Sequence, residues 1–346
     1  MLLLSIKETY MNVLVTGGAG YIGSHTVVAL LQAGYHVVIA DNLSNSKFDV
    51  IQRIEKITGI IPTFYQTDVC DSRALFNLFE KESIDAVIHF AGYKAVGESM
   101  SDPLKYYRNN LDSALTVLEM MQHFGVKHFV FSSSATVYGI PDSPQIKESF
   151  PIHPANCYGR TKAMIEEILM DLATSQPQMN IAILRYFNPI GAHTSALIGE
   201  DPNGIPNNLM PYITQVAIGK LEKLHIFGND YHTKDGTGVR DYIHVCDLAD
   251  GHLAALKKLE TDCGLVIYNL GTGIGYSVLD IVHAFEDTNK IKIPYVVDPR
   301  RTGDIDEYFA DPQKAYDEMG WATTRSLAQM CEDSWNWQTK NPNGYM

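Results

Sequence analysis

The hydrophobic positions of this chain fall into short apolar runs separated by longer segments of mixed polarity. Residues 12–16 form the first run and residues 37–40 the second. Between them, apolar residues recur at helical spacing from Ile22 onward, until Gly34 offers a residue that can end a helix. This order predicts a strand, a helix and a second strand that ends at Asp41.

The same alternation continues along the chain. Residues 86–90, 128–131 and 181–184 are apolar runs typical of buried parallel strands. Residues 104–124 and 158–175 lie between such runs and can form helices. Strands that alternate with helices predict an α/β fold with a doubly wound parallel sheet of the Rossmann type.

The local composition of the chain changes beyond about residue 188. Clusters of Asn, Pro and Gly occur at 188–191, 204–208 and 227–230, as in loops that carry binding residues. We therefore expect a nucleotide-binding Rossmann domain over 11–187. Residues 188–346 are expected to form mainly a smaller, loop-rich substrate domain, with some segments returning to the first.

The length of 346 residues favours two lobes with a cleft between them. Residues 1–10 contain an apolar stretch too short for a signal peptide or a membrane span. We expect them to be an extension outside the fold, with translation starting naturally at Met11.

The five cysteines include no Cys-x-x-Cys pair, which favours a reducing cytoplasm.

The net charge of −13, without any run of Lys or Arg, argues against nucleic acid as a partner. The twelve histidines form no His-Glu-x-x-His or similar cluster, so no metal site is expected.

A glycine-rich turn follows the first predicted strand. Gly17 allows a sharp bend, Gly20 lets a pyrophosphate approach the backbone, and Gly23 lets the helix pack on the strand. Asp41 stands 18 positions after Gly23, where its carboxylate can bind a ribose diol and would repel a 2′-phosphate. The pattern favours NAD over NADP, whereas the alternative is merely a tight turn between strand and helix.

Tyr158 and Lys162 form the one Tyr-x-x-x-Lys of the chain. Residues four apart share a helix face, so the lysine ammonium can stabilise the tyrosine anion. Ser134 ends a predicted strand at the carboxyl edge of the sheet, where ligands bind. About one such Tyr and Lys spacing is expected by chance. A surface contact between the ring and the lysine stem would be the favoured alternative if the glycine turn were absent.

The expected shift of the Tyr158 pKa has a definite size. Lowering a phenol pKa from about 10 to about 7 requires roughly 4 kcal/mol. One positive charge at about 4 to 5 Å supplies about 3 to 4 kcal/mol at an effective dielectric constant near 20. Lys162 and the positive ring of an oxidised nicotinamide together could therefore turn Tyr158 into a base.

Arg240 and Arg301 lie in the loop-rich half of this acidic chain. They could clamp a diphosphate through paired hydrogen bonds. Surface salt bridges to Asp241 and Asp304 are an equally good interpretation from the residues alone.

The chain also resembles the UDP-glucose 4-epimerases, which are extended short-chain dehydrogenases/reductases, from Met11 to its end. The stretches that carry the resemblance are residues 41–47, 89–99, 132–139, 184–189, 205–212 and 236–245. The resemblance implies reversible epimerisation of UDP-galactose and UDP-glucose through a transient 4-keto sugar and tightly held NAD. Tyr158 would act as the base, Ser134 would bond to the sugar O4, and Lys162 would hold the nicotinamide ribose.

The resemblance also implies two sets of binding residues. Those that contact NAD would be Gly17, Gly20, Tyr21, Ile22, Gly23, Asp41, Asn42, Asn45, Ser46, Asp68, Val69, Phe90, Ala91, Gly92, Lys94, Asn109, Ser134, Tyr158, Lys162 and Phe187. Those that contact the UDP-sugar would be Ser134, Tyr158, Asn188, Asn208, Leu209, His225, Phe227, Arg240, Arg301, Asp304 and Tyr308.

Tyr308 corresponds to the family position beside the sugar C2 substituent, so its bulk should exclude N-acetyl sugars. The family further implies a homodimer built on paired helices, for which the 104–124 and 158–175 segments are the expected elements. Cys157 stands before the base where a proline is common, which makes the site a candidate for oxidation.

Two other functions share parts of this pattern. Nucleotide-sugar 4,6-dehydratases begin with the same oxidation but carry an Asp-Glu pair after the serine, where this chain has Ala135 and Thr136. A regulator that senses NAD would keep the fold without the chemistry, and the retention of Ser134, Tyr158 and Lys162 argues against it.

Overall fold

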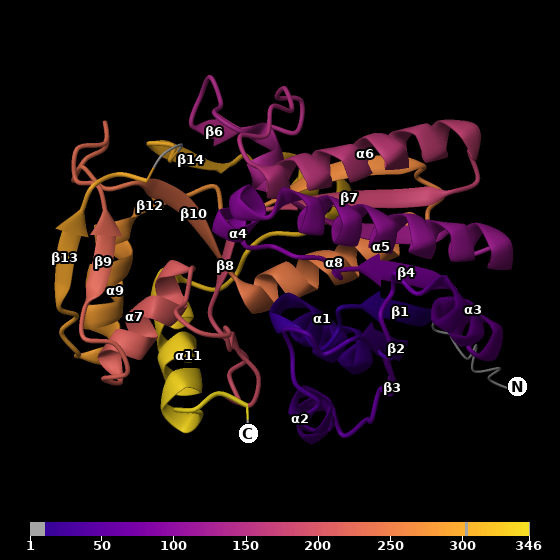
Figure 1. Cartoon of the computed structure of the whole chain (residues 1–346), viewed down its shortest axis with the longest axis horizontal. Coiled ribbons are helices and arrows are strands. Elements are labelled where there is room, and N and C mark those ends of the chain that lie inside the picture. Colours follow the sequence, from indigo (N-terminus) through magenta and orange to yellow (C-terminus); the bar gives the residue numbers. More distant parts are fainter. Residues whose placement is uncertain (1–10, 302–303, 346) are drawn as a thin grey trace, which may run out of the picture.

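The computed structural model describes residues 11–301 and 304–345 of the chain. Residues 1–10, on which the expected N-terminal extension falls, lie outside the described residues. A parallel sheet of seven strands forms the larger part, in the order β11-β7-β5-β4-β1-β2-β3 (Figure 1). Its strands are β1 (Asn12–Thr16), β2 (His36–Asp41), β3 (Thr63–Gln66), β4 (Ala86–His89), β5 (His128–Ser134), β7 (Asn180–Tyr186) and β11 (Leu265–Leu270).

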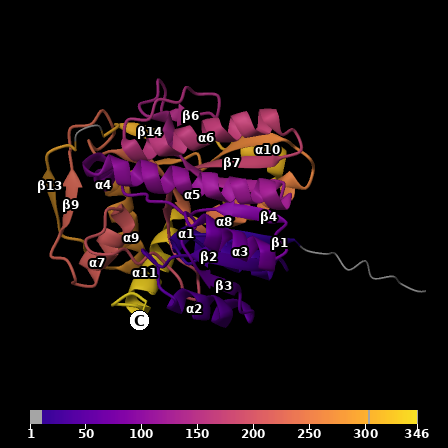
Figure 2. The same cartoon turned by 45° about the vertical axis from the view of Figure 1, so that its right-hand side comes forward.

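Helices cover both faces of this sheet, as Figures 1 and 2 show. They are α1 (Tyr21–Gln32), α2 (Asp49–Thr58) and α8 (Val245–Leu259) on one face, and α3 (Ser72–Lys81), α5 (Pro103–Phe124) and α6 (Cys157–Ser175) on the other. Successive strand residues face opposite sides, so Val13 and Val15 join one hydrophobic cluster and Leu14 the other. The predicted doubly wound fold is thereby confirmed.

The smaller part contains a mixed sheet and a helical cluster. The sheet runs β12-β10-β14-β6, with β8 beside β10, and a separate ribbon joins β13 to β9. These strands are β6 (Gln145–Ile146), β8 (Asn188–Ile190), β9 (Leu224–Phe227), β10 (Val239–His244), β12 (Gly275–Ser277), β13 (Tyr295–Asp298) and β14 (Glu307–Ala310). The helices are α7 (Leu209–Ala217), α9 (Val278–Asn289) and α11 (Leu327–Lys340), which enclose a third apolar cluster.

The two parts exchange segments. Strand β6, from the first half of the chain, pairs with β14, whereas α8 and β11 return from the second half to the large sheet. Short helices α4 (Val96–Ser101) and α10 (Gln313–Met319), and a 3₁₀ turn at Ala135–Tyr138, complete the described structure.

Strand order positions the site. The chain leaves β1 in one direction through β2 and β3, and then resumes on the other side of β1 with β4 and β5. Such a reversal opens a crevice at the carboxyl ends of the strands, where α/β proteins bind ligands. Among the helices of the described residues, none is long and apolar enough to span a membrane.

Candidate active site

The glycine turn after β1 has the shape that a dinucleotide requires. Gly17 has a φ of +70°, and a Cβ there would lie 2.9 Å from the backbone nitrogen of Ala91. A Cβ on Gly23 would overlap the carbonyl oxygen of Gly17. Helix α1 begins at Tyr21, and no side chain caps its N-terminus. Its first amide groups therefore suit a pyrophosphate, and the turn fits the cofactor.

Asp41 ends β2 beside this turn. Its Oδ1 accepts hydrogen bonds from Leu43 N at 2.9 Å and Ser46 Oγ at 2.8 Å, and its Oδ2 accepts from Ala19 N at 3.0 Å. Each carboxylate oxygen can accept two bonds, so one position on Oδ2 is left for a ribose hydroxyl. The carboxylate is thus held in place by the chain before any ligand arrives.

The other residues expected at the cofactor line the same edge of the sheet. Asn42 donates to Asp68 at 3.3 Å, and Asn109 donates to Asn110 at 3.0 Å. A Cβ on Gly92 would lie 3.2 Å from the Asn110 side-chain oxygen. Phe90 and Ala91 directly follow the end of β4, and Val69 lies shortly after the end of β3. Ile22, in the first turn of α1, packs against the hydrophobic core.

Two of these residues contact the loop before α7. Lys94 donates to Glu200 Oε1 at 3.4 Å, and Asn208 donates to the same oxygen at 2.7 Å. Asn45 accepts a hydrogen bond from Asn203 at 2.9 Å. Glu200 therefore joins a residue expected at the cofactor to a residue expected at the substrate.

Ser134, Tyr158 and Lys162 meet where β5 ends against the first turns of α6. Asn156 caps α6 by accepting from Gly159 N at 2.8 Å, which fixes the helix start beside Tyr158. Ser134 Oγ accepts from Thr136 Oγ1 at 3.0 Å and interacts with the Tyr158 phenol. The predicted triad is brought together.

Lys162 reaches from α6 to strand β5. Its Nζ donates to the carbonyl oxygen of Ser132 at 2.6 Å and lies 6.0 Å from the centroid of the Tyr158 ring. Burial raises the pKa of Tyr158 to about 12, although its hydrogen bond with Ser134 opposes that shift. Burial also lowers the pKa of Lys162 to about 8. Strand β5 therefore holds the ammonium near the Tyr158 ring, and the stabilisation of a Tyr158 phenolate by Lys162 together with an oxidised nicotinamide ring stays a prediction.

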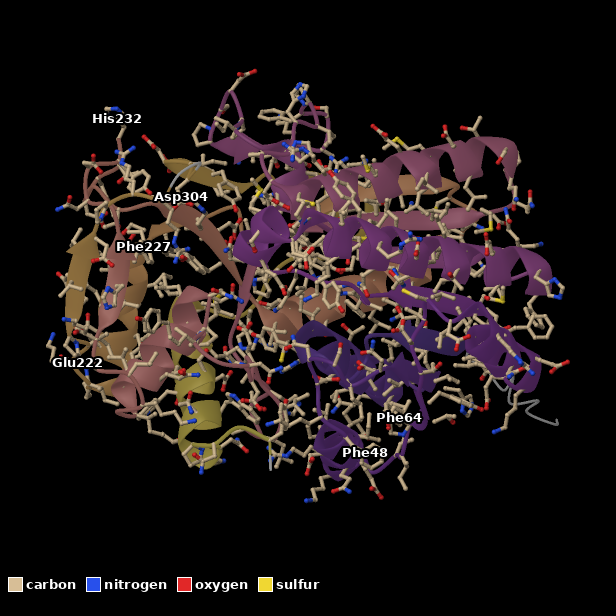
Figure 3. All side chains as sticks on the ribbon, viewed as in Figure 1. Phe48, Phe64, Glu222, Phe227, His232 and Asp304 are labelled. Atoms are coloured by element: carbon tan, nitrogen blue, oxygen red, sulfur yellow. The ribbon has the colours of Figure 1, made fainter. Side chains whose placement is uncertain are left out.

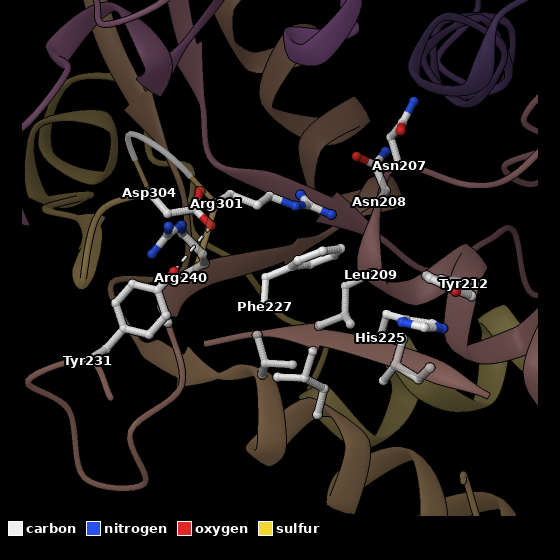
Figure 4. A pocket seen from close by; sticks show the side chains of 14 residues that line it. Asn207, Asn208, Leu209, Tyr212, His225, Phe227, Tyr231, Arg240, Arg301 and Asp304 are labelled. Carbon is white, nitrogen blue, oxygen red and sulfur yellow. Dashed lines mark hydrogen bonds between the residues drawn. The ribbon is translucent and has the colours of Figure 1, made fainter. Parts of the chain in front are cut away.

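A pocket in the smaller part gathers most of the residues expected at the substrate (Figure 4). Its lining includes Asn208, Leu209, His225, Phe227, Arg240, Arg301 and Asp304. Figure 3 shows Phe227 and Asp304 on the same lobe, away from Phe48 and Phe64 beside α2.

The two arginines of the pocket lie on aromatic rings. The guanidinium of Arg301 lies 3.8 Å from the centroid of Phe227, and that of Arg240 lies 4.7 Å from the centroid of Tyr308. Within residues 11–301 and 304–345, neither arginine forms an ion pair. The salt-bridge alternative is thus absent from the described structure. Arg240 Nη1 donates to the Val239 carbonyl oxygen at 2.7 Å, and the other N–H groups of both side chains could bind an anion.

Of the other residues expected at the substrate, Tyr308 and Asn188 are not among those that line the pocket. Tyr308 is paired in register with Arg240, and its ring centroid is 5.8 Å from that of Phe187. Asn188 begins β8 directly after Phe187. His225, which lines the pocket, contacts Asp298 Oδ2 through Nδ1 at 2.7 Å, and no local pattern in the sequence links the two residues.

The sequence interpretation missed several lining residues. Asn207, Tyr212 and Tyr231 also face the pocket. Tyr231 donates to Asp304 at 3.3 Å. Asn207 and Tyr212 lie within the 205–212 stretch and were available as candidates, whereas the contact between Tyr231 and Asp304 joins residues that no local pattern links.

Comparisons with known proteins agree with one another. The family model described as GDP-mannose 4,6 dehydratase matches residues 14–334. UDP-glucose 4-epimerase of Bacillus subtilis is 58% identical over 335 residues, which cover 97% of this chain and 99% of that protein. The mouse (Mus musculus) UDP-glucose 4-epimerase is 55% identical over 341 residues, covering 96% and 98%.

Two solved structures extend the similarity to three dimensions. UDP-glucose 4-epimerase from Stenotrophomonas maltophila, with bound NAD and formylated UDP-arabinopyranose, has a TM-score of 0.95 at 50% identity and covers 96% of this chain and 99% of its own. The Bifidobacterium longum enzyme, in complex with NAD+ and UDP, has a TM-score of 0.93 at 49% identity and covers 96% and 100%. The chain therefore belongs to the UDP-glucose 4-epimerase family.

Proposed function

We propose that this site interconverts UDP-galactose and UDP-glucose by oxidising C4 of the sugar to a ketone and reducing the ketone from its other face. The observation that carries the proposal is the meeting of Ser134, at the end of β5, with Tyr158, in the first turn of α6. The same chain has the Gly17 turn, which suits a dinucleotide, and the pocket lined by Phe227, which suits a nucleoside diphosphate.

NAD is the cofactor, and when bound it takes the hydride from C4 of the sugar and returns it to the opposite face. Tyr158 accepts the proton of the 4-hydroxyl group in the forward half and donates it back in the return half. Ser134, which interacts with the Tyr158 phenol, donates to the sugar O4 and keeps it beside the phenol oxygen. No net proton or hydride is gained or lost over the cycle.

The ionisation of Tyr158 needs positive charge from its surroundings. A shift of its pKa from about 12 to about 7 corresponds to roughly 7 kcal/mol, at about 1.4 kcal/mol per unit. One cation at about 4 to 5 Å supplies about 3 to 4 kcal/mol. Lys162 and the charged nicotinamide ring would act together on the Tyr158 hydroxyl.

Substrate binding is assigned to the pocket on the smaller part. Arg240 and Arg301 would hold the diphosphate, and Phe227 would pack against the uracil ring. Asn208 and Leu209, at the start of α7, would close the other side. The large sheet and its loops would hold NAD, through the residues that the sequence analysis named. An anchored diphosphate lets the ketone sugar turn over while it stays in the site.

Tyr308 would set the size limit beside the sugar C2 substituent. Its side chain lies between Arg240 and Phe187, and it interacts electrostatically with Tyr158. We propose that its bulk excludes UDP-N-acetylglucosamine.

The active form is proposed to be a homodimer through α5 and α6. These helices pack side by side and expose apolar side chains: Leu104 is 78% exposed, Leu115 40%, Met164 41% and Met170 37%. Exposed apolar groups on neighbouring helices favour burial against a second copy.

A reducing cytoplasm stays a prediction, supported by the five free thiols.

The function is tested with Tyr158→Phe and Ser134→Ala. We expect UDP-galactose turnover to fall by at least about 100-fold in each, since each loses a proton-transfer group. Bound NAD and Tm should stay close to the parent values. Unchanged turnover in Tyr158→Phe would contradict the assigned chemistry.

A further inference from the structure

A buried charged network lies behind the catalytic groups, between β5, α6 and β7. Arg185 Nη2 contacts Glu166 Oε2 at 2.6 Å, and Arg185 Nε donates to Glu166 Oε1 at 3.1 Å. Both side chains are 2% exposed. Ser133 Oγ donates to the same Glu166 Oε1 at 2.5 Å. None of these residues belongs to the proposed chemistry.

Arg185 Nη1 also forms two hydrogen bonds. Its Nη1 donates to Tyr138 Oη at 2.9 Å and to the carbonyl oxygen of Glu148 at 3.1 Å. Tyr138 in turn donates to Asn269 at 2.7 Å. A buried ion pair rarely stabilises a fold more than well-packed apolar residues of the same size. A contribution to the stability of the fold therefore does not by itself explain this network.

The network is connected to the active site through two segments of backbone. Tyr158, Lys162 and Glu166 follow one another at intervals of four residues on α6, so they share one face of the helix. On β5, the Ser132 carbonyl accepts from Lys162, and the Ser133 hydroxyl donates to Glu166. The end of β5 is thus tied to α6 at successive residues, and Ser134 is the next residue along.

We propose, on the basis of the proposed epimerase function, that Glu166 is a positioning residue that fixes the end of β5 against α6. Held by Arg185, it sets the placement of Lys162 and Ser134 relative to Tyr158.

The charge of Glu166 also acts on Lys162. Burial lowers the Lys162 pKa, and the negative charge of Glu166 raises it. The other groups around the ammonium are the Ser132 carbonyl, the rings of Phe131 and Tyr158, and the buried imidazole of His89 on β4. None of them is an anion while Tyr158 is protonated. Glu166 is therefore the group that favours the charged form of Lys162.

The test compares Glu166→Gln with the neutral pair Glu166→Gln/Arg185→Met in the full-length protein loaded with NAD. Gln keeps the shape of the side chain and removes its charge. Glu167→Gln is the matched control, because Glu167 is the next residue on α6 and is exposed. The measurements are kcat and KM for UDP-galactose, the pH dependence of kcat, bound NAD and Tm.

We expect kcat of Glu166→Gln to fall at least about 10-fold with KM within about 3-fold, because orientation of the reacting groups is lost rather than binding. The alkaline decline of kcat should move to lower pH by at least about 0.5 units, since Lys162 loses its proton more easily. The neutral pair Glu166→Gln/Arg185→Met should regain the Tm that Glu166→Gln loses, but not the lost kcat. Glu167→Gln should have the kcat, pH profile and Tm of the parent protein.

Other results would overturn the inference. A parent-like kcat and pH profile in Glu166→Gln would show that the charge does not matter to turnover. Recovery of both Tm and kcat in the neutral pair would show that the network only needs to be electrically balanced. If the parent protein itself fails to convert UDP-galactose, the proposed function falls and this role of Glu166 falls with it.

Discussion

Arg240 and Tyr308 occupy paired positions on the parallel strands β10 and β14, with the guanidinium 4.7 Å from the ring centroid. Arg240 lines the pocket that suits a diphosphate, and Tyr308 is close enough to Tyr158 to contribute to the rise of its pKa. A ligand whose phosphates bind at Arg240 would place its sugar beside Tyr308.

Replacing Tyr308 with a small residue should therefore widen the sugar site. We expect Tyr308→Ala to raise turnover of UDP-N-acetylglucosamine at least about 10-fold, because the removed ring leaves space for the acetamido group. Tyr316→Ala is the control, since Tyr316 is 57% exposed. Epimerisation of both substrates would be followed by chromatography. Substantial turnover of the N-acetyl substrate by the parent protein would refute the size limit.

The Gly17 turn offers a matched pair of glycine variants. Gly17 and Gly59 have similar φ values, +70° and +74°, so alanine costs about 1 kcal/mol of backbone strain at either. Only at Gly17 would the new Cβ meet nearby atoms, the backbone of residues 90 and 91, whereas none lies within 4 Å at Gly59. We expect Gly17→Ala to lose most of its bound NAD and Gly59→Ala to keep it. Equal NAD content in the two purified variants would contradict the role of the turn.

Three buried histidines predict loss of stability in acid. Burial lowers the pKa of His25 to about 3, of His89 to about 3 and of His252 to about 4. They stay neutral in the folded state while the unfolded chain takes up protons below about 6.5, so their contribution is complete above that pH and is lost as pH falls toward 4.

Near pH 5, the three histidines together should lower the free energy of unfolding by about 4 kcal/mol for each pH unit of acidification. Denaturant unfolding at several pH values measures it. His25→Gln should reduce the slope by about a third, whereas His232→Gln, at an exposed position, should not change it. A free energy of unfolding that is flat from pH 7 to pH 5 would be inconsistent with these neutral histidines.

The proposed dimer makes a prediction about the apolar faces of α5 and α6. Leu115→Glu and Met164→Glu should shift the protein toward monomer, because each would bury a charge in the interface. Ile61→Glu is the control, since Ile61 is 67% exposed and lies outside both helices. Sedimentation at micromolar concentration distinguishes the species. A parent protein that is already monomeric would rule out this assembly.

The sequence predicted those parts of the site that depend on residues close to one another along the chain. The Gly17 turn, its flanking strands, and Tyr158 with Lys162 each depend on residues less than thirty positions apart. The Lys162 hydrogen bond to Ser132 and the Glu166 contact with Arg185 depend instead on how β5, α6 and β7 pack. Residue spacing carries no signal for such contacts, so neither could be predicted from the sequence.

The exchange of segments between the two parts is another non-local feature. Strand β6 has two residues and pairs with β14, which follows it by some 160 positions. A strand that short has no periodicity to recognise. Resemblance to the family supplied residues that physical patterns alone left open, such as Asn208 and Asp304 in the pocket.

The central claim is tested most directly by incubating the purified protein with UDP-galactose, without added cofactor, while UDP-glucose and reduced nicotinamide are measured together. Steady formation of UDP-glucose without net accumulation of NADH is the predicted result, because NAD is retained and regenerated in each cycle. A requirement for added NAD would remove the claim of retention but leave the chemistry. A 4-keto-6-deoxy product, or no product even with NAD supplied, would contradict the assignment as an epimerase.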